Sequence, residues 1–321
     1  MNRNLVISTN KKKEDSNNKT QVSILGASGI GKVHARSFQK MGSEVCSILS
    51  SSESSGKDTA KELKDLFNIS AKSFIDLKSL LSKSEPDAIS ICTPMDMHFD
   101  HILQCLDANI PVFCEKPLFW NKGLTRDEFK EKIKIISDHP NRQLFMNNSS
   151  AFYIEFISEY LENLSEINKF SFQFHTNGFL RNRDIAIDLL PHGLSMILKL
   201  LGENQTKNFN YNESANSYSC NFNYGKTYVE FDFRESNEIK KKFLFSINDK
   251  HFLRIQEGNI NNYKVYLKNL DSEEIFEIPD PFELSISRFI EFCNKPINNR
   301  IDNFNKDALV MELLGDLLLQ E

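Results

Sequence analysis

Two residues in the second half of the chain have the types and spacing for proton transfer. Asp188 and His192 lie four positions apart in DLLPHG, which opens an apolar segment that runs to about Leu201 and ends at Gly202. Both side chains can therefore face one side of the start of a helix, with the carboxylate orienting the imidazole. The alternative is a helix cap at Asp188 and a packed or surface histidine. A metal site here lacks a credible third ligand, because His175 and Asp184 match no known ligand spacing.

A lysine is the third candidate for chemistry. Lys116 lies in Glu115-Lys116-Pro117, directly after the apolar run VFC, and an earlier segment, TPMDMH, follows the apolar run AISIC in the same way. Open α/β sheets bind ligands at the carboxyl ends of their strands, where a lysine can direct an ammonium into a cleft. The alternative is a solvated surface lysine. The two segments supply five candidate cofactor contacts: Thr93, Pro94, His98, Glu115 and Lys116.

A glycine-rich turn predicts where a dinucleotide binds. The strand QVSIL ends in GASGIGKVH directly before a helix, and glycines in such a turn let the backbone approach a pyrophosphate. The candidate contacts are Gly26, Ser28, Gly29, Ile30 and Gly31. Ser28 takes the place of the middle glycine of the GxGxxG pattern, and a plain glycine turn is the alternative interpretation.

The end of the second strand bears on the choice between NAD and NADP. No acid follows this strand; instead Ser50, Ser51 and Ser52 offer hydroxyl groups and Lys57 offers positive charge, although Glu53 lies close by. This arrangement suits a 2′-phosphate better than a free 2′-hydroxyl, so NADP is slightly favoured over NAD. A simple polar loop is the alternative.

The elements that must hold these residues follow from the apolar pattern. From Gln21 to about 147, short apolar strands alternate with helices, which predicts a doubly wound parallel Rossmann sheet. From about 148 to the end, several runs alternate apolar and polar residues before two closing helices, which predicts an α+β domain with a large, open, mostly antiparallel sheet. Residues 1–20 are interpreted as a disordered tail, with no signal-peptide core.

Composition excludes several classes of partner. The 321-residue chain has 39 Lys and Arg against 44 Asp and Glu, well interspersed, for a net charge of −5, so it lacks the basic surface that binds nucleic acid. No apolar stretch is long enough to suggest a membrane span. The six scattered cysteines form no CxxC pair, which favours a reducing, cytoplasmic location.

Taken in order, the GIGKVH turn, the CTPMDMH segment, EKP and DLLPHGLSMI resemble the Gfo/Idh/MocA oxidoreductase family over residues 21–321. The resemblance implies a Rossmann domain that carries NAD(P), then a domain for substrate binding and oligomerisation whose sheet often packs against another subunit as a homodimer or homotetramer. It also implies roles for three residues. Lys116 contacts the substrate hydroxyl and the nicotinamide, Asp188 binds substrate, and His192 is the acid/base. A cis peptide bond before Pro117 would fit the family.

Two departures from the family pattern concern the substrate. Many sugar and inositol dehydrogenases of the family have DxGxHxxD, whereas this chain has Leu190 in place of the glycine and Ser195 in place of the last acid. The segment 147–153 also lacks an arginine that is often found near there.

The expected function is an NAD(P)-dependent dehydrogenase of carbohydrate metabolism, which transfers a hydride between the nicotinamide and a hydroxyl or keto carbon of a sugar, an inositol or a nucleotide-linked sugar. Two alternatives stay open. One is a reductase of a non-sugar substrate, such as an imine or a tetrapyrrole, and the other is a non-catalytic NAD(P)-binding regulator.

Overall fold

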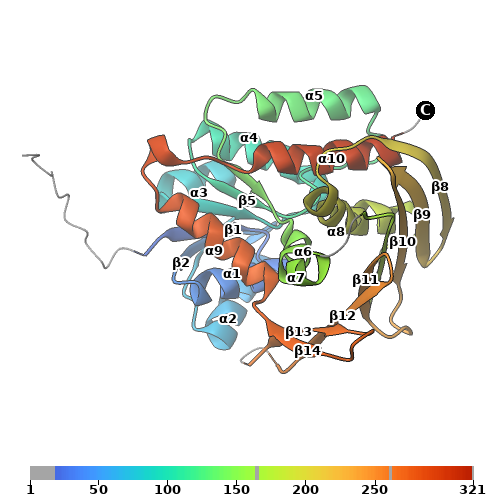
Figure 1. The fold of residues 1–321 in the computed structure, drawn as a ribbon. Coiled ribbons are helices and arrows are strands. Elements are labelled where there is room, and N and C mark those ends of the chain that lie inside the picture. Colours follow the sequence, from blue (N-terminus) through green and yellow to red (C-terminus); the bar gives the residue numbers. More distant parts are fainter. Residues whose placement is uncertain (1–18, 163–165, 260–261, 320–321) are drawn as a thin grey trace, which may run out of the picture.

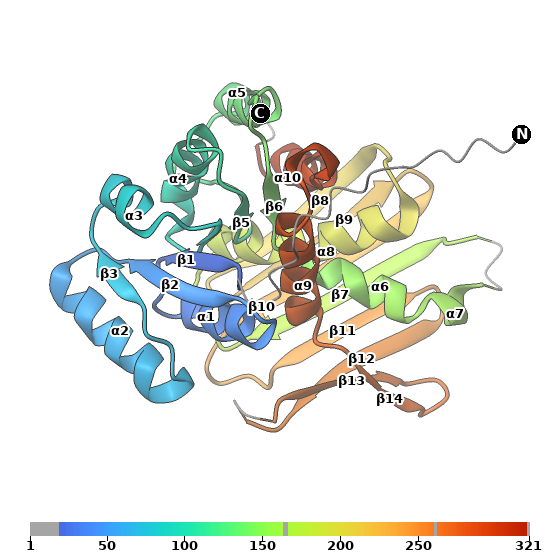
Figure 2. The ribbon, with the colours of Figure 1, turned by 90° about the vertical axis from the view of Figure 1, so that its left-hand side faces the viewer.

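The structure is a computed structural model that describes residues 19–162, 166–259 and 262–319. Most of the predicted tail, residues 1–18, lies outside the described residues. Two sheets organise the chain, and Figure 2 shows the first on one side of the molecule and the second on the other.

The first sheet has six parallel strands in the order β3-β2-β1-β4-β5-β6. Its strands are β1 (Gln21–Leu25), β2 (Glu44–Leu49), β3 (Lys72–Phe74), β4 (Ala88–Ile91), β5 (Val112–Cys114) and β6 (Leu144–Met146). The connecting helices are α1 (Ile30–Lys40), α2 (Glu53–Phe67), α3 (Leu77–Ser84), α4 (Met95–Asp107) and α5 (Arg126–Ser137). Strands β1 and β4 are almost entirely buried, because helices cover both faces of the sheet. The predicted Rossmann fold is confirmed.

The second sheet has eight strands in the order β14-β13-β12-β11-β7-β10-β9-β8, and every pair is antiparallel except β7 with β10. The strands are β7 (Lys169–Thr176), β8 (Thr206–Ser214), β9 (Ser217–Tyr224), β10 (Thr227–Glu235), β11 (Lys242–Ile247), β12 (Lys250–Glu257), β13 (Lys264–Asn269) and β14 (Ile275–Ile278). The predicted large, mostly antiparallel sheet is confirmed.

One face of the second sheet is apolar and the other is polar. Alternate residues of β7, β9, β10 and β11 are buried aromatic or aliphatic side chains, and Figure 1 shows the sheet curving around α8 (Arg183–Leu201) on this inner side. The residues between them, such as Ser171, Asn221 and Glu230, point to the outer face. This alternation is the half-buried pattern that the sequence predicts.

The remaining helices fill the space between the sheets. The short helices α6 (Phe152–Phe156) and α7 (Ser158–Leu161) follow a 3-10 turn at Ser149–Ala151, and a second such turn, Ile297–Asn299, separates α9 (Pro281–Cys293) from α10 (Phe304–Leu318). Both C-terminal helices return to the first sheet. The α9 residues Phe289 and Phe292 make edge-to-face contacts with Phe145 of β6, and α10 packs against α5 and β6.

The start of α8 corrects one expectation. The helix begins at Arg183, so Asp188 lies inside it and is not its cap. The helix opens with the partly buried Arg183 and the exposed Asp184, and the buried Ile185, Ala186 and Ile187 already precede Asp188.

None of the six cysteines, all of which lie in the described ranges, forms a disulfide. Within those ranges no helix combines the length and the apolar character that crossing a membrane requires.

Candidate active site

The glycine turn forms a tight backbone cradle between β1 and α1. A Cβ on Gly31 would lie 2.1 Å from the carbonyl oxygen of Gly26, and a Cβ on Gly26 would lie 2.7 Å from the carbonyl oxygen of Cys92. Gly29, at φ +53°, has open space around it. The amides of Gly29 and Ile30 donate no hydrogen bond to any described residue, and the first turn of α1 contains no acid. This turn therefore fits the pyrophosphate of a dinucleotide, which needs close backbone approach and free amides at a helix start.

The serines after β2 divide into two groups. Ser52 is the N-cap of α2, where its hydroxyl accepts a hydrogen bond from the Ser55 amide at 3.2 Å. Ser50 and Ser51 take no part in this cap and lie at the carboxyl end of β2, with Ser51 exposed. Glu53 begins α2 and is also exposed. The end of β2 thus presents hydroxyl groups from Ser50 and Ser51.

Glu115 belongs to a buried polar network that joins three strands to α1. Its Oε1 accepts hydrogen bonds from His34 Nε2 and from Asn147 Nδ2, both at 2.7 Å, and His34 Nδ1 lies 2.8 Å from Ser90 Oγ. Burial opposes charge on both partners, yet the hydrogen bonds and charges of Cys92 and Glu115 raise the pKa of His34 to about 10. His34, Lys116 and Asn147 lower the pKa of Glu115 to about 2 against the same effect of burial. The network is therefore a buried ion pair that fixes the segment before Lys116.

Lys116 lies between the two halves of the molecule. Its ammonium donates hydrogen bonds to the Asp188 carboxylate and, at 3.0 Å, to the Asp188 backbone carbonyl, and the Lys116–Pro117 peptide bond is cis. Although burial lowers the pKa of Lys116, the carboxylates of Asp188 and Glu115 raise it above its ordinary value. The carboxylate of Glu235 is close enough to contribute as well. Lys116 is thus a cation at neutral pH, held at the first sheet by its backbone and at α8 by its side chain.

The other residues of the two strand ends have structural contacts. His98 is buried, and its ring nitrogens lie 2.9 Å from the Pro117 carbonyl oxygen and 2.6 Å from the Thr93 carbonyl oxygen. Thr93 Oγ1 lies 3.0 Å from His101 Nδ1, and Pro94 is the residue before α4. His98 therefore joins the segment after β4 to the segment after β5, and it positions both of them.

His192 faces a cavity with one ring nitrogen free. Its Nδ1 lies 2.9 Å from Ser150 Oγ, and Nε2 has no hydrogen-bond partner among the described residues. Burial, together with the positive charges of Lys116 and Arg254, holds the pKa of His192 well below its ordinary value. The imidazole is thus neutral at pH 7 and can accept a proton. The partner of its Nδ1 is Ser150, whereas the Asp188 carboxylate is paired with Lys116.

The cavity at His192 has a volume of 380 Å³ and lies between the start of α1, the segment 149–153 and the inner face of the second sheet. Its walls are partly aromatic, from Tyr153, Phe174 and Phe243, and partly polar, from Ser150, Arg36, Arg254, Gln256, Tyr263 and Asp280. A cavity of this size, largely apolar with a few convergent polar groups, is typical of a site for one small molecule.

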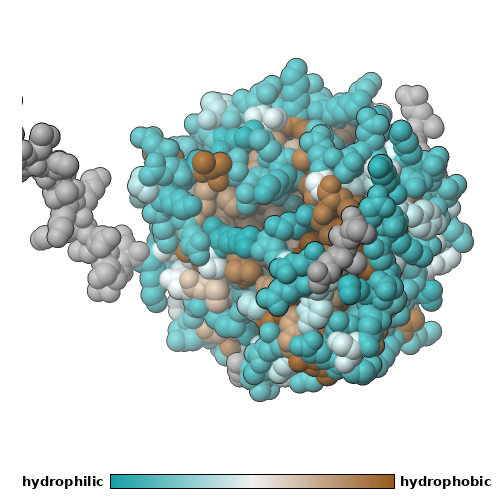
Figure 3. Space-filling view, in the orientation of Figure 1, coloured by the Kyte–Doolittle hydropathy of each residue, from teal (hydrophilic) through white to brown (hydrophobic). Residues whose placement is uncertain are grey.

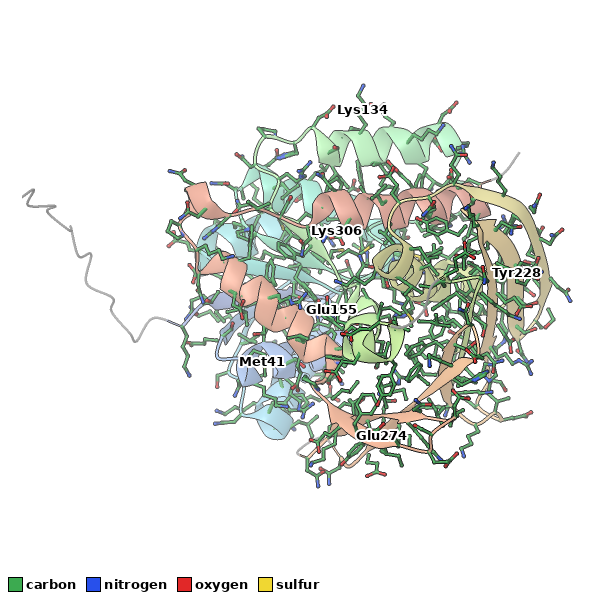
Figure 4. The ribbon with its side chains drawn as sticks, in the orientation of Figure 1. Met41, Lys134, Glu155, Tyr228, Glu274 and Lys306 are labelled. Atoms are coloured by element: carbon green, nitrogen blue, oxygen red, sulfur yellow. The ribbon has the colours of Figure 1, made fainter. Side chains whose placement is uncertain are left out.

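A larger cavity, of 490 Å³, lies on the other side of α8. Glu155 and Lys306 line it, and Figure 4 labels both residues. Figure 3, drawn in the same orientation, shows apolar residues on this face with hydrophilic residues around them. Ser195, in the place of the last acid of the family pattern, also lines this cavity, and its hydroxyl donates to the His192 backbone carbonyl at 2.8 Å. Because His192 lines the smaller cavity and not this one, we take the smaller cavity as the candidate active site.

The structure brings together the three residues predicted to act in catalysis and adds others. Lys116 and Asp188 are in contact, and His192 follows one turn later on α8. His34 was visible only as the last residue of GIGKVH. Ser150, Asn147 and Arg254 carry no local signal, because only the packing of distant segments places them at the site.

Comparisons with known proteins agree with this geometry. Residues 20–148 match the family described as "Oxidoreductase family, NAD-binding Rossmann fold", Gfo/Idh/MocA. The chain is 26% identical over 101 residues to a myo-inositol 2-dehydrogenase of Thermotoga maritima, covering 32% of this chain, and 30% identical over 99 residues to a D-glucoside 3-dehydrogenase of Escherichia coli, covering 30%. The matched parts span 29% and 27% of those relatives' lengths.

Among solved structures, a 3-ketoreductase of Actinomadura kijaniata in complex with TDP-benzene and NADP superposes with a TM-score of 0.66 at 16% identity, covering 93% of this chain and 96% of that one. Both sheets thus belong to a fold that known proteins share. The match to the Gfo/Idh/MocA oxidoreductase family covers the N-terminal Rossmann domain of this chain, residues 20–148.

Proposed function

We propose that the chain is an NAD(P)-dependent oxidoreductase that acts on a hydroxyl or keto carbon of a sugar, an inositol or a nucleotide-linked sugar. The observation that carries this proposal is the contact of a protonated Lys116 with Asp188 on α8, the helix that places a neutral His192 in the cavity with no described partner on Nε2. The glycine cradle for a dinucleotide leads into α1, whose Ile30 and Val33 also line the cavity. The names of relatives that act on inositol and glucosides support the substrate class.

The residues that would hold the dinucleotide come from the first sheet. The amides at Ser28, Gly29 and Ile30 would bind the pyrophosphate, and the hydroxyl groups of Ser50 and Ser51 would meet the adenosine ribose. When bound, the nicotinamide supplies the hydride chemistry. NADP is our slight preference over NAD, because β2 ends in two serines whose hydroxyl groups bond to no described residue, and no acid directly follows the strand.

The side chains of the site divide the remaining work. For oxidation of an alcohol, His192 Nε2 accepts the hydroxyl proton, and the ammonium of Lys116 stabilises the negative charge that develops on the oxygen. Asp188 holds Lys116 in place with its carboxylate and its backbone carbonyl. In the reverse direction His192 returns the proton and Lys116 polarises the carbonyl.

An absorbance assay tests the proposal. Inositols, glucosides and nucleotide sugars are supplied with NAD or NADP, and the reduced nicotinamide band is followed. We expect turnover of at least one member, and we expect Lys116→Ala and His192→Ala each to lower kcat by about a hundredfold to ten-thousandfold. The dinucleotide should still raise the melting temperature of both variants.

The matched controls are Lys122→Ala, an exposed lysine in the same connection, and His251→Ala, on the outer face of the second sheet. Both should keep full activity. Turnover that is unchanged in Lys116→Ala and His192→Ala would refute the assigned roles, and a dinucleotide that binds without turnover of any candidate would contradict an oxidoreductase function.

We also propose that the outer face of the second sheet packs against another copy of the chain, as a homodimer or homotetramer. This face carries Tyr228, which is 37% exposed and which Figure 4 labels at the outer side of the sheet, next to the Lys169–Glu230 ion pair. Sedimentation equilibrium of the chain and of Tyr228→Glu tests this. A monomer in the unmodified chain would contradict the proposal.

A further inference from the structure

Arg254 extends from the inner face of the second sheet into the cavity at His192. It follows Phe252 by two positions on β12, so both side chains lie on the same face of the sheet, and Phe252 is fully buried there. The guanidinium carbon lies 4.2 Å from the centre of the Phe243 ring and 5.5 Å from that of Phe174. A cation therefore stands in a wall that is otherwise aromatic.

The charge of Arg254 has no carboxylate partner among the described residues. By contrast, Arg126, Arg142, Arg234 and Arg288 all form ion pairs with Asp or Glu. Contact with aromatic rings uses the face of a guanidinium, whereas its N–H groups lie in its plane. Most of these donors are thus available to a ligand in the cavity, apart from a hydrogen bond to the neighbouring Tyr153 hydroxyl.

The rest of the cavity has a positive balance. Its lining contains two arginines, Arg254 and Arg36, and one carboxylate, Asp280. Asp280 is the N-cap of α9, where its Oδ1 accepts a hydrogen bond from the Phe282 amide at 2.9 Å. His192 is neutral, so it adds no charge. A planar guanidinium whose charge has no carboxylate partner in the described part of the chain can bind carboxylate or phosphate oxygens in a bidentate way.

We propose that the substrate is a polyhydroxylated molecule with an anionic group, a carboxylate or a phosphate, which Arg254 binds while the reacting carbon lies at His192. This inference rests on the proposed function for the position of the reacting carbon. It names a specificity determinant on the second sheet, separate from the residues that carry out proton transfer.

Binding measurements test the inference without any need for turnover. Isothermal titration in the presence of NADP, or of NAD if that dinucleotide binds better, compares matched sets: a neutral sugar or inositol, the same skeleton with a carboxylate, and the same skeleton with a phosphate. We expect at least one anionic form, the carboxylate or the phosphate, to bind at least tenfold more tightly than the neutral form of the same skeleton. The carboxylate and phosphate arms identify which of the two groups is recognised.

Three variants connect that preference to Arg254. Arg254→Met keeps an apolar stem on Phe243 and should raise the Kd of the anionic ligand about tenfold to a hundredfold, with little change for the neutral one. Arg254→Lys keeps the charge and should retain part of the preference. The control is Arg234→Met, which removes an arginine on the outer face that is already paired with Asp232.

The outcomes separate this inference from the proposed function. Equal binding of neutral and anionic ligands, or a preference that survives in Arg254→Met, overturns the inference even if neutral sugars are oxidised. Binding of an acidic sugar that depends on Arg254, without turnover, supports the inference while the proposed function fails. A thermal melt of each variant shows whether it is folded, and Arg254→Lys provides the comparison if Arg254→Met is not.

Discussion

The two walls of the active-site cavity are built by different means. The wall on the side of the first sheet is the start of α1, which is held by backbone and buried polar groups in short consecutive motifs, such as the glycine turn and Glu115-Lys116-Pro117. The wall from the second sheet uses side chains from strands far apart in the sequence, such as Phe174, Phe243 and Arg254. The first wall is thus fixed by close contacts that tolerate little change, whereas the second can vary its side chains and with them the ligand it accepts. Four predictions test this difference.

The largest effect is expected from breaking the buried ion pair. Glu115→Ala leaves a protonated His34 buried without its carboxylate partner, and we expect it to lower the free energy of unfolding by about 3–5 kcal/mol. Urea denaturation at neutral pH measures this. The control is Glu230→Ala on the outer face of the second sheet, whose ion pair with Lys169 is half exposed and should contribute less than about 1 kcal/mol. Equal losses of unfolding free energy in Glu115→Ala and Glu230→Ala would show that the first wall is no more rigid than the second sheet.

Two helical glycines give a second test. Gly31→Ala brings a Cβ against the backbone carbonyl of Gly26, which cannot move without opening the turn, so we expect a loss of about 2–3 kcal/mol and weaker dinucleotide binding. In Gly193→Ala on α8, the Cβ meets the Phe231 ring at 2.7 Å, and a side chain can move. We expect that variant to lose only about 1 kcal/mol. Thermal melts with and without dinucleotide measure both effects, and a larger loss in Gly193→Ala would reverse the comparison.

The pH dependence of stability should also originate in the first wall. The pKa of His34 is raised from 6.5 to about 10 in the folded chain, so the folded state keeps a proton that the unfolded chain releases above pH 6.5. The contribution is therefore complete below pH 6.5 and is lost as the pH rises toward 10, by at most about 1.4 kcal/mol per pH unit. Between pH 6.5 and 8 we expect a decrease of about 2 kcal/mol.

Urea denaturation at several pH values compares the unmodified chain with His34→Gln. The variant should be less stable at pH 6.5 and should lose less stability as the pH rises. If the two chains show the same slope, the His34–Glu115 pair does not carry a buried charge.

The smallest effect concerns the hydrogen bond that orients His192. Ser150→Ala removes the partner of Nδ1, which lies 2.9 Å from it, and we expect kcat to fall about threefold to tenfold with stability almost unchanged. The control is Ser149→Ala, which lines the same cavity without a side-chain hydrogen bond to a described residue. Steady-state kinetics measure both variants. A fall in kcat that is equal in the two would mean that Ser150 does not orient the imidazole.

Much of this molecule was predictable from local patterns. Both sheets, the glycine turn and the helix around His192 follow from apolar periodicity and short motifs, because parallel buried strands and half-buried antiparallel strands have different patterns. Some strands carry little of that signal, for identifiable reasons. β3 has three residues, and β8 and β14 are the two edges of the second sheet, where many residues are exposed.

β12 is the informative exception, because it lies inside the second sheet. Its inner face should be apolar throughout, but Arg254 and Gln256 occupy two of the inner positions, since there the strand lines a cavity and not the core. Arg254 and Gln256 interrupt the apolar pattern of the strand, and they are also residues that a ligand in the cavity can contact.

The sequence by itself determined which side chains could do chemistry: a lysine after a strand, an acid and a histidine four apart, and glycines before a helix. Only the tertiary structure decided how they pair. Asp188 bonds to Lys116 while His192 bonds to Ser150, and Arg254 comes from a distant strand to the same cavity. The physical reason is that motif spacing records local backbone geometry, whereas hydrogen-bond partners and cavity walls depend on how two separate sheets pack.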